Sequence, residues 1–109
     1  MSFVTHLFHT QQRIQNGRII ASDPVMRRAN FDYDITGNNV TISITPVLSP
    51  KRAHLVRQVG YNLYYQGEDP SYRFELECWP DNGTIKRLSV FRDDTGVEYR
   101  YISDHQDRL

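Results

Sequence analysis

The last third of the chain, residues 72–102, constrains the fold most strongly, because apolar and polar residues alternate there through three segments separated by turn sequences. The segments read YRFELECW, TIKRLSVFRD and VEYRYI, and the turns contain PDNG and DTG. Alternation with a period of two is typical of β-strands that bury one face. We therefore predict a three-stranded antiparallel meander over this region.

A register for this meander follows from loops at residues 81–83 and 93–96. In this register Leu76 faces Leu88 on one side of the sheet, and Glu77 meets Arg87 on the other. A slip of one residue would exchange the two faces, so the match of apolar with apolar and acid with base is informative. The predicted core face carries Tyr72, Phe74, Leu76, Cys78, Leu88, Val90, Val97, Tyr99 and Tyr101.

The opposite face of the meander mixes charged with apolar side chains. Trp79 opposes Ile85 there, beside the Glu77–Arg87 pair, and Trp and Arg are enriched at binding hot spots. This patch can be covered by the N-terminal segment of the same chain, by a second copy of the chain, or by a ligand or foreign partner. The interface candidates are Trp79, Ile85, Arg87, Ile102 and Glu77.

Residues 3–15 fit two structures. Apolar pairs spaced i,i+4, such as Phe3 with Leu7, favour a helix. The rival is a pair of strands that turns at residues 16–17, because Asn-Gly is the strongest short hairpin signal. We predict the helix, followed by a short strand at residues 18–20 and a turn at residues 22–24.

The middle of the chain contains a hairpin and a second predicted helix. Residues 31–36 and 40–45 alternate apolar with polar around a Gly-Asn-Asn turn, which is typical of a hairpin with one apolar face. Ser49 and Pro50 resemble an N-cap and first helical residue, and Gly60 stands where a helix-ending glycine belongs. We predict a helix between them, with an apolar stripe, and a strand at residues 61–66.

These elements predict one α+β domain over residues 1–109. Its sheet is mostly antiparallel, has five to seven strands including the C-terminal meander, and carries one or two helices on one face. A chain of this length can bury a core without disulfides or metal. Cys78 is the only cysteine, so an internal disulfide is impossible and a reducing compartment is expected. With no signal-peptide pattern and no long apolar run, we expect a cytoplasmic protein without a membrane segment.

Charge is divided unevenly along a chain whose formal net charge is zero. Residues 1–59 hold seven basic and three acidic side chains, and residues 60–109 hold six basic and ten acidic ones. We expect the two halves to pair within the fold or between subunits. Nucleic-acid binding is not expected, because its footprint normally makes a whole domain basic.

Few residues suggest chemistry. His6 and His9 share a side of a helix but lack a further ligand motif, and Cys78 falls on the predicted core face, where cysteine is usually inert. We expect no metal, no cofactor and no catalytic residue. Basic residues at the start of the second predicted helix would form an anion site with its free N–H groups. The anion candidates are Ser49, Lys51 and Arg52.

Two functional hypotheses follow from these observations. The first is a small non-catalytic interaction protein that forms a homodimer through the outer face of the meander. The alternative is a domain that binds a small molecule, or a small enzyme, with a pocket between helix and sheet. The tyrosines expected to line that pocket are Tyr61, Tyr64, Tyr65, Tyr99 and Tyr101.

Overall fold

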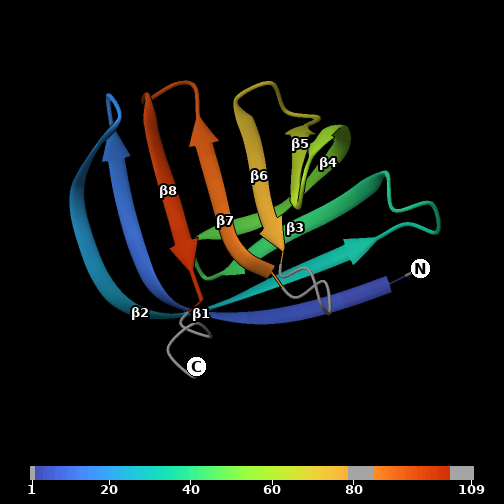
Figure 1. Ribbon diagram of the computed structural model, residues 1–109, viewed down its shortest axis with the longest axis horizontal. Coiled ribbons are helices and arrows are strands. Elements are labelled where there is room, and N and C mark those ends of the chain that lie inside the picture. Colours follow the sequence, from blue (N-terminus) through green and yellow to red (C-terminus); the bar gives the residue numbers. More distant parts are fainter. Residues whose placement is uncertain (1, 79–84, 104–109) are drawn as a thin grey trace.

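A computed structural model describes residues 2–78 and 85–103 of the 109-residue chain. They form eight antiparallel strands in a closed barrel, in which each strand pairs with the next and β1 pairs with β8 (Figure 1). The predicted α+β class is wrong, since none of these residues is helical and no helix covers the sheet. The strands are β1 (Ser2–Gln15), β2 (Arg18–Tyr33), β3 (Asn39–Thr45), β4 (Leu48–Val59), β5 (Asn62–Gly67), β6 (Tyr72–Cys78), β7 (Ile85–Arg92) and β8 (Val97–Ile102).

The predicted N-terminal helix is instead strand β1, and the rival hairpin is correct. Gln15 pairs with Arg18, and the two residues between them both have positive φ, 54° at Asn16 and 75° at Gly17. A type I′ turn requires this conformation at both central positions, and Asn-Gly adopts it readily. The i,i+4 apolar spacing did not distinguish the two structures, because an even spacing also places residues on one face of a strand.

β2 is continuous where a turn was predicted at residues 22–24. Pro24 pairs with Thr10, and a register shift between Phe8 and Thr10 accommodates it, as expected for a proline beside a β-bulge. Figure 1 shows β1 and β2 as long curved strands that sweep round the barrel. Residues 10–15 of β1 then pair with residues 97–102 of β8 and close it.

The second predicted helix is strand β4. Its inward side chains alternate through Ala53 and Leu55, and it pairs with β3 on one side and β5 on the other. Gly60 has φ 59° and begins a two-residue turn between Val59 and Asn62, which is the type II′ position that favours glycine. The glycine therefore ends a strand rather than a helix, and pairing with distant strands overrides the local helix signals.

The predicted register of the meander is confirmed except at Ile85, and Leu76 pairs with Leu88 between β6 and β7. The predicted hairpin in residues 31–45 also forms, with Phe31 paired to Ile42 between β2 and β3. Across the second turn of the meander, Leu88 pairs with Tyr101 as predicted. Alternation of apolar and polar residues and the length of the loop are therefore sufficient to predict the register of adjacent strands.

Ile85 departs from the predicted register. A shift after Glu77 pairs Ile85 with Cys78, which turns the Ile85 side chain into the core, where it is 1% exposed. Trp79, its expected partner, lies outside the described residues. Glu77 still pairs with Arg87 on the outer face as predicted.

The barrel interior is filled by large apolar side chains from β1, β2, β3, β6 and β7. They include Phe8, Phe31 and Leu76, each fully buried. Interior filling of this kind is expected of an eight-stranded barrel, whose lumen is just wide enough for its side chains or for one small ligand. Within the described part of the chain, no helix is long and apolar enough to cross a membrane.

Candidate functional site

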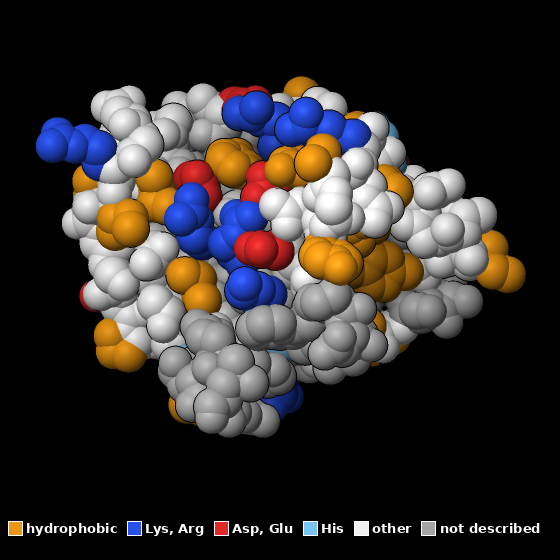
Figure 2. Space-filling view, viewed as in Figure 1, with side chains coloured by type: hydrophobic (Ala, Val, Ile, Leu, Met, Phe, Trp, Pro, Cys, Tyr) orange, Lys and Arg blue, Asp and Glu red, His pale blue; other side chains and the backbone are white. Residues whose placement is uncertain are grey.

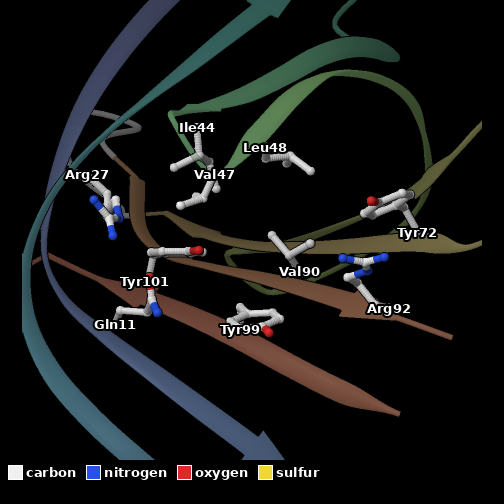
Figure 3. A pocket seen from close by; sticks show the side chains of 10 residues that line it. All are labelled: Gln11, Arg27, Ile44, Val47, Leu48, Tyr72, Val90, Arg92, Tyr99 and Tyr101. Carbon is white, nitrogen blue, oxygen red and sulfur yellow. The ribbon is translucent and has the colours of Figure 1, made fainter. Parts of the chain in front are cut away.

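A cavity of about 220 Å³ lies at the end of the barrel that carries the β3–β4, β5–β6 and β7–β8 connections. Among the described residues, every strand except β5 contributes to its wall, together with Val47 of the β3–β4 connection (Figure 3). The lining has an aliphatic part, an aromatic part and a polar part. Its members are Ile44, Val47, Leu48 and Val90; Tyr72, Tyr99 and Tyr101; and Gln11, Arg27 and Arg92.

The aromatic wall is held in place by the core. Tyr72 stacks on Phe74 with ring centroids 6.2 Å apart and an interplanar angle of 6°, and Tyr101 packs against Phe8 at 6.1 Å. Because Phe8 and Phe74 are buried, their contacts hold the Tyr72 and Tyr101 rings in place. Both tyrosine rings line the cavity. The tyrosines therefore offer a preformed surface, which lowers the entropy lost on binding.

Two cations lie against Tyr72. The guanidinium carbon of Arg92 is 5.5 Å from the Tyr72 ring centroid, and Lys51 Nζ is 4.9 Å from the same centroid. Both distances are within the range of cation–π attraction. Arg92 Nη2 also donates to Asp94 Oδ2 at 3.1 Å, which balances the charge of Arg92.

Polar atoms without partners gather at the cavity wall. Gln11 Oε1, Arg27 Nε and Arg92 Nε are buried and have no hydrogen-bond partner among the described residues. Arg27 also makes no ion pair with any acid in the described part of the chain. Buried polar groups are nearly always satisfied by protein or by ordered water, so these three atoms are candidates to bond a ligand or water in the cavity.

Burial raises the pKa of Tyr101 to about 12, and Tyr99 adds to this effect while the Arg27 charge opposes it. The Tyr101 hydroxyl is therefore neutral at physiological pH and can donate a hydrogen bond. Arg27 and Gln11 line the same cavity as this phenol, and Figure 3 shows all three side chains at one side of it.

Raised phenol pKa values predict a loss of stability at high pH. Burial raises the pKa of Tyr101 and of Tyr65 to about 12 in the folded state, whereas an unfolded tyrosine titrates near 10.0. The unfolded state loses these protons first, so their stabilisation is complete below pH 10 and is lost as the pH rises from 10 to 12. The free energy of unfolding is expected to fall by the order of 1 kcal/mol per pH unit in that window.

Urea titrations between pH 7 and pH 11.5 measure this effect. Tyr101→Phe is expected to make the decline shallower, because the variant has one buried phenol fewer. Tyr61→Phe, which removes a phenol that is 63% exposed, should leave the decline as in the wild type. A wild-type profile that stays level from pH 10 to pH 11.5 would contradict the prediction.

The five tyrosines predicted to share a pocket do not lie together. Tyr99 and Tyr101 line the cavity, whereas the Tyr65 hydroxyl donates to Gly37 O at 3.2 Å at the opposite end of the barrel. Tyr64 lies on the outer face, 4.2 Å from the Arg57 guanidinium, and Tyr61 is exposed in the β4–β5 turn. A pocket between helix and sheet is excluded because β4 replaces the helix.

The predicted interface residues are also separated. Ile85 lies in the core, and Trp79 lies outside the described residues. Arg87 is bonded to Glu75, Glu77 and Ser89 in a ladder on the outer face of β6 and β7. Figure 2 shows basic and acidic side chains interleaved over the centre of this face. Ile102 pairs with Arg87 at the edge of the ladder and is half-buried.

The predicted anion residues lie on β4, without the helix that was expected to supply free N–H groups. Ser49 is exposed, and Arg52 Nε forms an ion pair with Glu68 Oε1 at 3.3 Å. Lys51 is the member that approaches the cavity, through its contact with Tyr72. An anion site at a helix N-terminus is therefore excluded, because residues 48–59 form strand β4.

His6 and His9 lie on β1 rather than on a helix. His6 is 7% exposed and packs against Phe8 with ring centroids 4.9 Å apart. No group of three or more His, Cys, Asp or Glu side chains that could hold a metal ion occurs within residues 2–78 and 85–103. Burial raises the pKa of the half-buried Cys78 thiol, which lowers its reactivity.

The sequence interpretation missed Gln11, Arg27 and Arg92 as cavity residues. Arg27 could have been identified from the sequence, because residues 27, 29 and 31 alternate onto the same face of β2, and Ala29 and Phe31 are buried there. A charged residue that continues the buried face of a strand is a candidate functional residue. The turn predicted at residues 22–24 hid this continuity.

Comparisons with protein-family models, with curated proteins and with solved structures found no match. The chemistry of the site is therefore argued from its own side chains. Aliphatic walls exclude water, phenols donate hydrogen bonds, and guanidinium groups favour a negative charge. Together these properties suit the retention of a small amphipathic molecule.

Proposed function

We propose that this protein binds one small molecule with an apolar body in the cavity at the end of its barrel. The observation that carries the proposal is a cavity of about 220 Å³ whose lining includes three buried polar atoms without partners among the described residues. Binding sites are typically concave and mostly apolar, with a few placed polar groups. The cavity likewise combines aliphatic and aromatic side chains with the polar side chains of Gln11, Arg27 and Arg92.

The dimensions limit the ligand. Sites for drug-sized molecules span roughly 300–1,000 Å³, so a cavity of about 220 Å³ suits a smaller ligand. Liquid water occupies roughly 30 Å³ per molecule, so the ligand would displace the equivalent of about seven waters. Medium-length alkyl compounds and single-ring aromatic compounds are of this size.

Non-catalytic binding is the proposed role, since rigid rings and apolar walls account for the cavity without a reaction. Self-association through the outer face of the meander stays a separate prediction. A free thiol at Cys78 is consistent with the proposed cytoplasmic location.

Titration with the neutral fluorophore 1-naphthylamine, whose two fused rings are close to the cavity in volume, tests the proposal. We expect saturable binding at one site per chain. Val47→Trp is expected to weaken binding about tenfold, or 1.4 kcal/mol, because the indole fills the cavity mouth. Val47 is 48% exposed, so the substitution should leave the fold intact.

Val59→Trp is the matched control. Val59 is 58% exposed at the opposite end of β4, so the same substitution there should leave the affinity unchanged. The proposal fails if the wild type shows no saturable binding, or if the two variants lose affinity equally.

A further inference from the structure

Among the described residues, no acid balances the charge of Arg27. The other arginine of the cavity wall has one, because Arg92 pairs with Asp94 at 3.1 Å, and Arg52 and Arg73 pair with acids on the outer surface. Arg27 forms neither an ion pair nor a hydrogen bond with any of the described residues. A partly buried cation without a counter-charge is costly, and a negatively charged ligand would remove that cost.

The surroundings of Arg27 suit the head group of such a ligand. Tyr101 and Gln11 line the same cavity as Arg27 (Figure 3). A guanidinium presents paired donors that match the two oxygens of a carboxylate, and a neutral phenol adds a third donor. An amide side chain can rotate to donate through its nitrogen as well.

The rest of the cavity suits an apolar tail. Ile44 and Val90 are 0% and 4% exposed, and Leu48 continues this aliphatic surface away from Arg27 (Figure 3). Arg92 lies at the far side of the cavity but already shares its charge with Asp94. Of the two cations that line the cavity, Arg27 is the one without an ion pair to a described acid, and it lies beside the aliphatic surface, so a single negative charge on an apolar body matches the site.

We infer that the ligand is a small monocarboxylate, whose carboxylate is bound by Arg27 with Tyr101 and Gln11 and whose apolar body contacts Ile44, Leu48 and Val90. This inference rests on the proposed function, because it names the chemical class of ligand for the same cavity. Arg27 supplies the preference for charge, and the aliphatic wall supplies affinity that does not depend on charge.

Calorimetric titrations with octanoate and octanamide at neutral pH test the inference, because the two compounds share one chain and differ in charge. We expect the wild type to bind octanoate about 10–100-fold more tightly, as hydrogen bonds to charged groups contribute roughly that factor. Arg27→Gln is expected to weaken octanoate binding far more than octanamide binding, and so to abolish the preference. Arg27→Lys, which keeps the charge but not the paired donors, should retain a reduced preference.

Arg52→Gln is the matched control, because it removes an arginine whose charge is already paired with Glu68 outside the cavity. It should leave the preference for octanoate intact. Equal binding of octanoate and octanamide by the wild type, or a preference that persists in Arg27→Gln, would overturn the inference without affecting the proposed function. If neither compound nor the neutral fluorophore binds the wild type, the proposed function fails and the inference fails with it.

Discussion

Phe8→Ala is expected to lower the free energy of unfolding by about 3–5 kcal/mol. That is a large fraction of the roughly 5–15 kcal/mol by which small domains are stable. Phe8 is fully buried and contacts both His6 and Tyr101 in the barrel interior. Alanine at this position removes the ring from a region where β1 has no freedom to collapse, because β1 is bonded to β2 around it. The loss therefore combines the transfer energy of the ring with the cost of a cavity.

Phe3→Ala is the matched control within the same strand. Phe3 is 65% exposed, so its replacement should change the free energy of unfolding by less than about 0.5 kcal/mol. Chemical denaturation of the two variants measures the difference. A helix at residues 3–15 would bury Phe3 as well as Phe8. Similar losses of unfolding free energy in Phe3→Ala and Phe8→Ala would therefore contradict the assignment of these residues to strand β1.

Arg87→Met is expected to lower the free energy of unfolding by about 1–3 kcal/mol, the cost of leaving partly buried charged groups without their partner. Arg87 Nε donates to Glu77 Oε1 at 3.2 Å, Arg87 Nη1 donates to Ser89 Oγ at 2.7 Å, and Arg87 Nη2 is bonded to Glu75. The side chains of Arg87 and Glu75 are each 18% exposed, so water screens the pair weakly. Methionine leaves Glu75 without this cation, and Glu77 keeps only Lys86, whose Nζ lies 3.9 Å from Glu77 Oε2.

Arg52→Met provides the comparison on the same barrel. The Arg52–Glu68 pair is 62% exposed on both sides, so its loss should cost less than about 1 kcal/mol. Urea unfolding at low and at moderate salt measures both variants. Equal effects of the two substitutions, or a restoration of stability in Arg87→Met by salt alone, would show that the outer ladder is solvated rather than partly buried.

The registers of two hairpins could be predicted from sequence because they depend on neighbours along the chain. A short loop fixes which residues of two adjacent strands face each other, and alternation fixes which face is apolar. Leu76 opposite Leu88 followed from these local rules. Ile85 did not, because a register shift between Glu77 and Cys78 moved it by one position and therefore to the other face.

The helices could not be excluded from sequence, because their signals were shared with strands. Phe3 and Leu7 are four residues apart, which is a same-face spacing in both structures. Gly60 marks a helix end or a hairpin turn equally well. Pairing of β4 with β3 and of β1 with β8 decided between them, and those contacts join segments far apart in the chain.

The candidate site was predicted in part. Tyr99 and Tyr101 were correctly placed on one buried face, but their neighbours in the cavity come from six other strands and from the β3–β4 connection. Arg27 approaches Tyr101 because β1 lies between β2 and β8, so closure of the barrel carries the side chains of β2 round to those of β8. No local pattern encodes that proximity.

By itself the sequence determined the apolar and polar faces of the C-terminal meander and of the 31–45 hairpin, since alternation and turn chemistry act over a few residues. The tertiary structure alone decided that the sheet closes on itself, that residues 3–15 and 50–59 are strands, and that Arg27 shares a cavity with Tyr101. The physical reason is range: a strand satisfies its backbone hydrogen bonds with partners elsewhere in the chain. Which segments become strands therefore depends on which partners the closed barrel brings beside them.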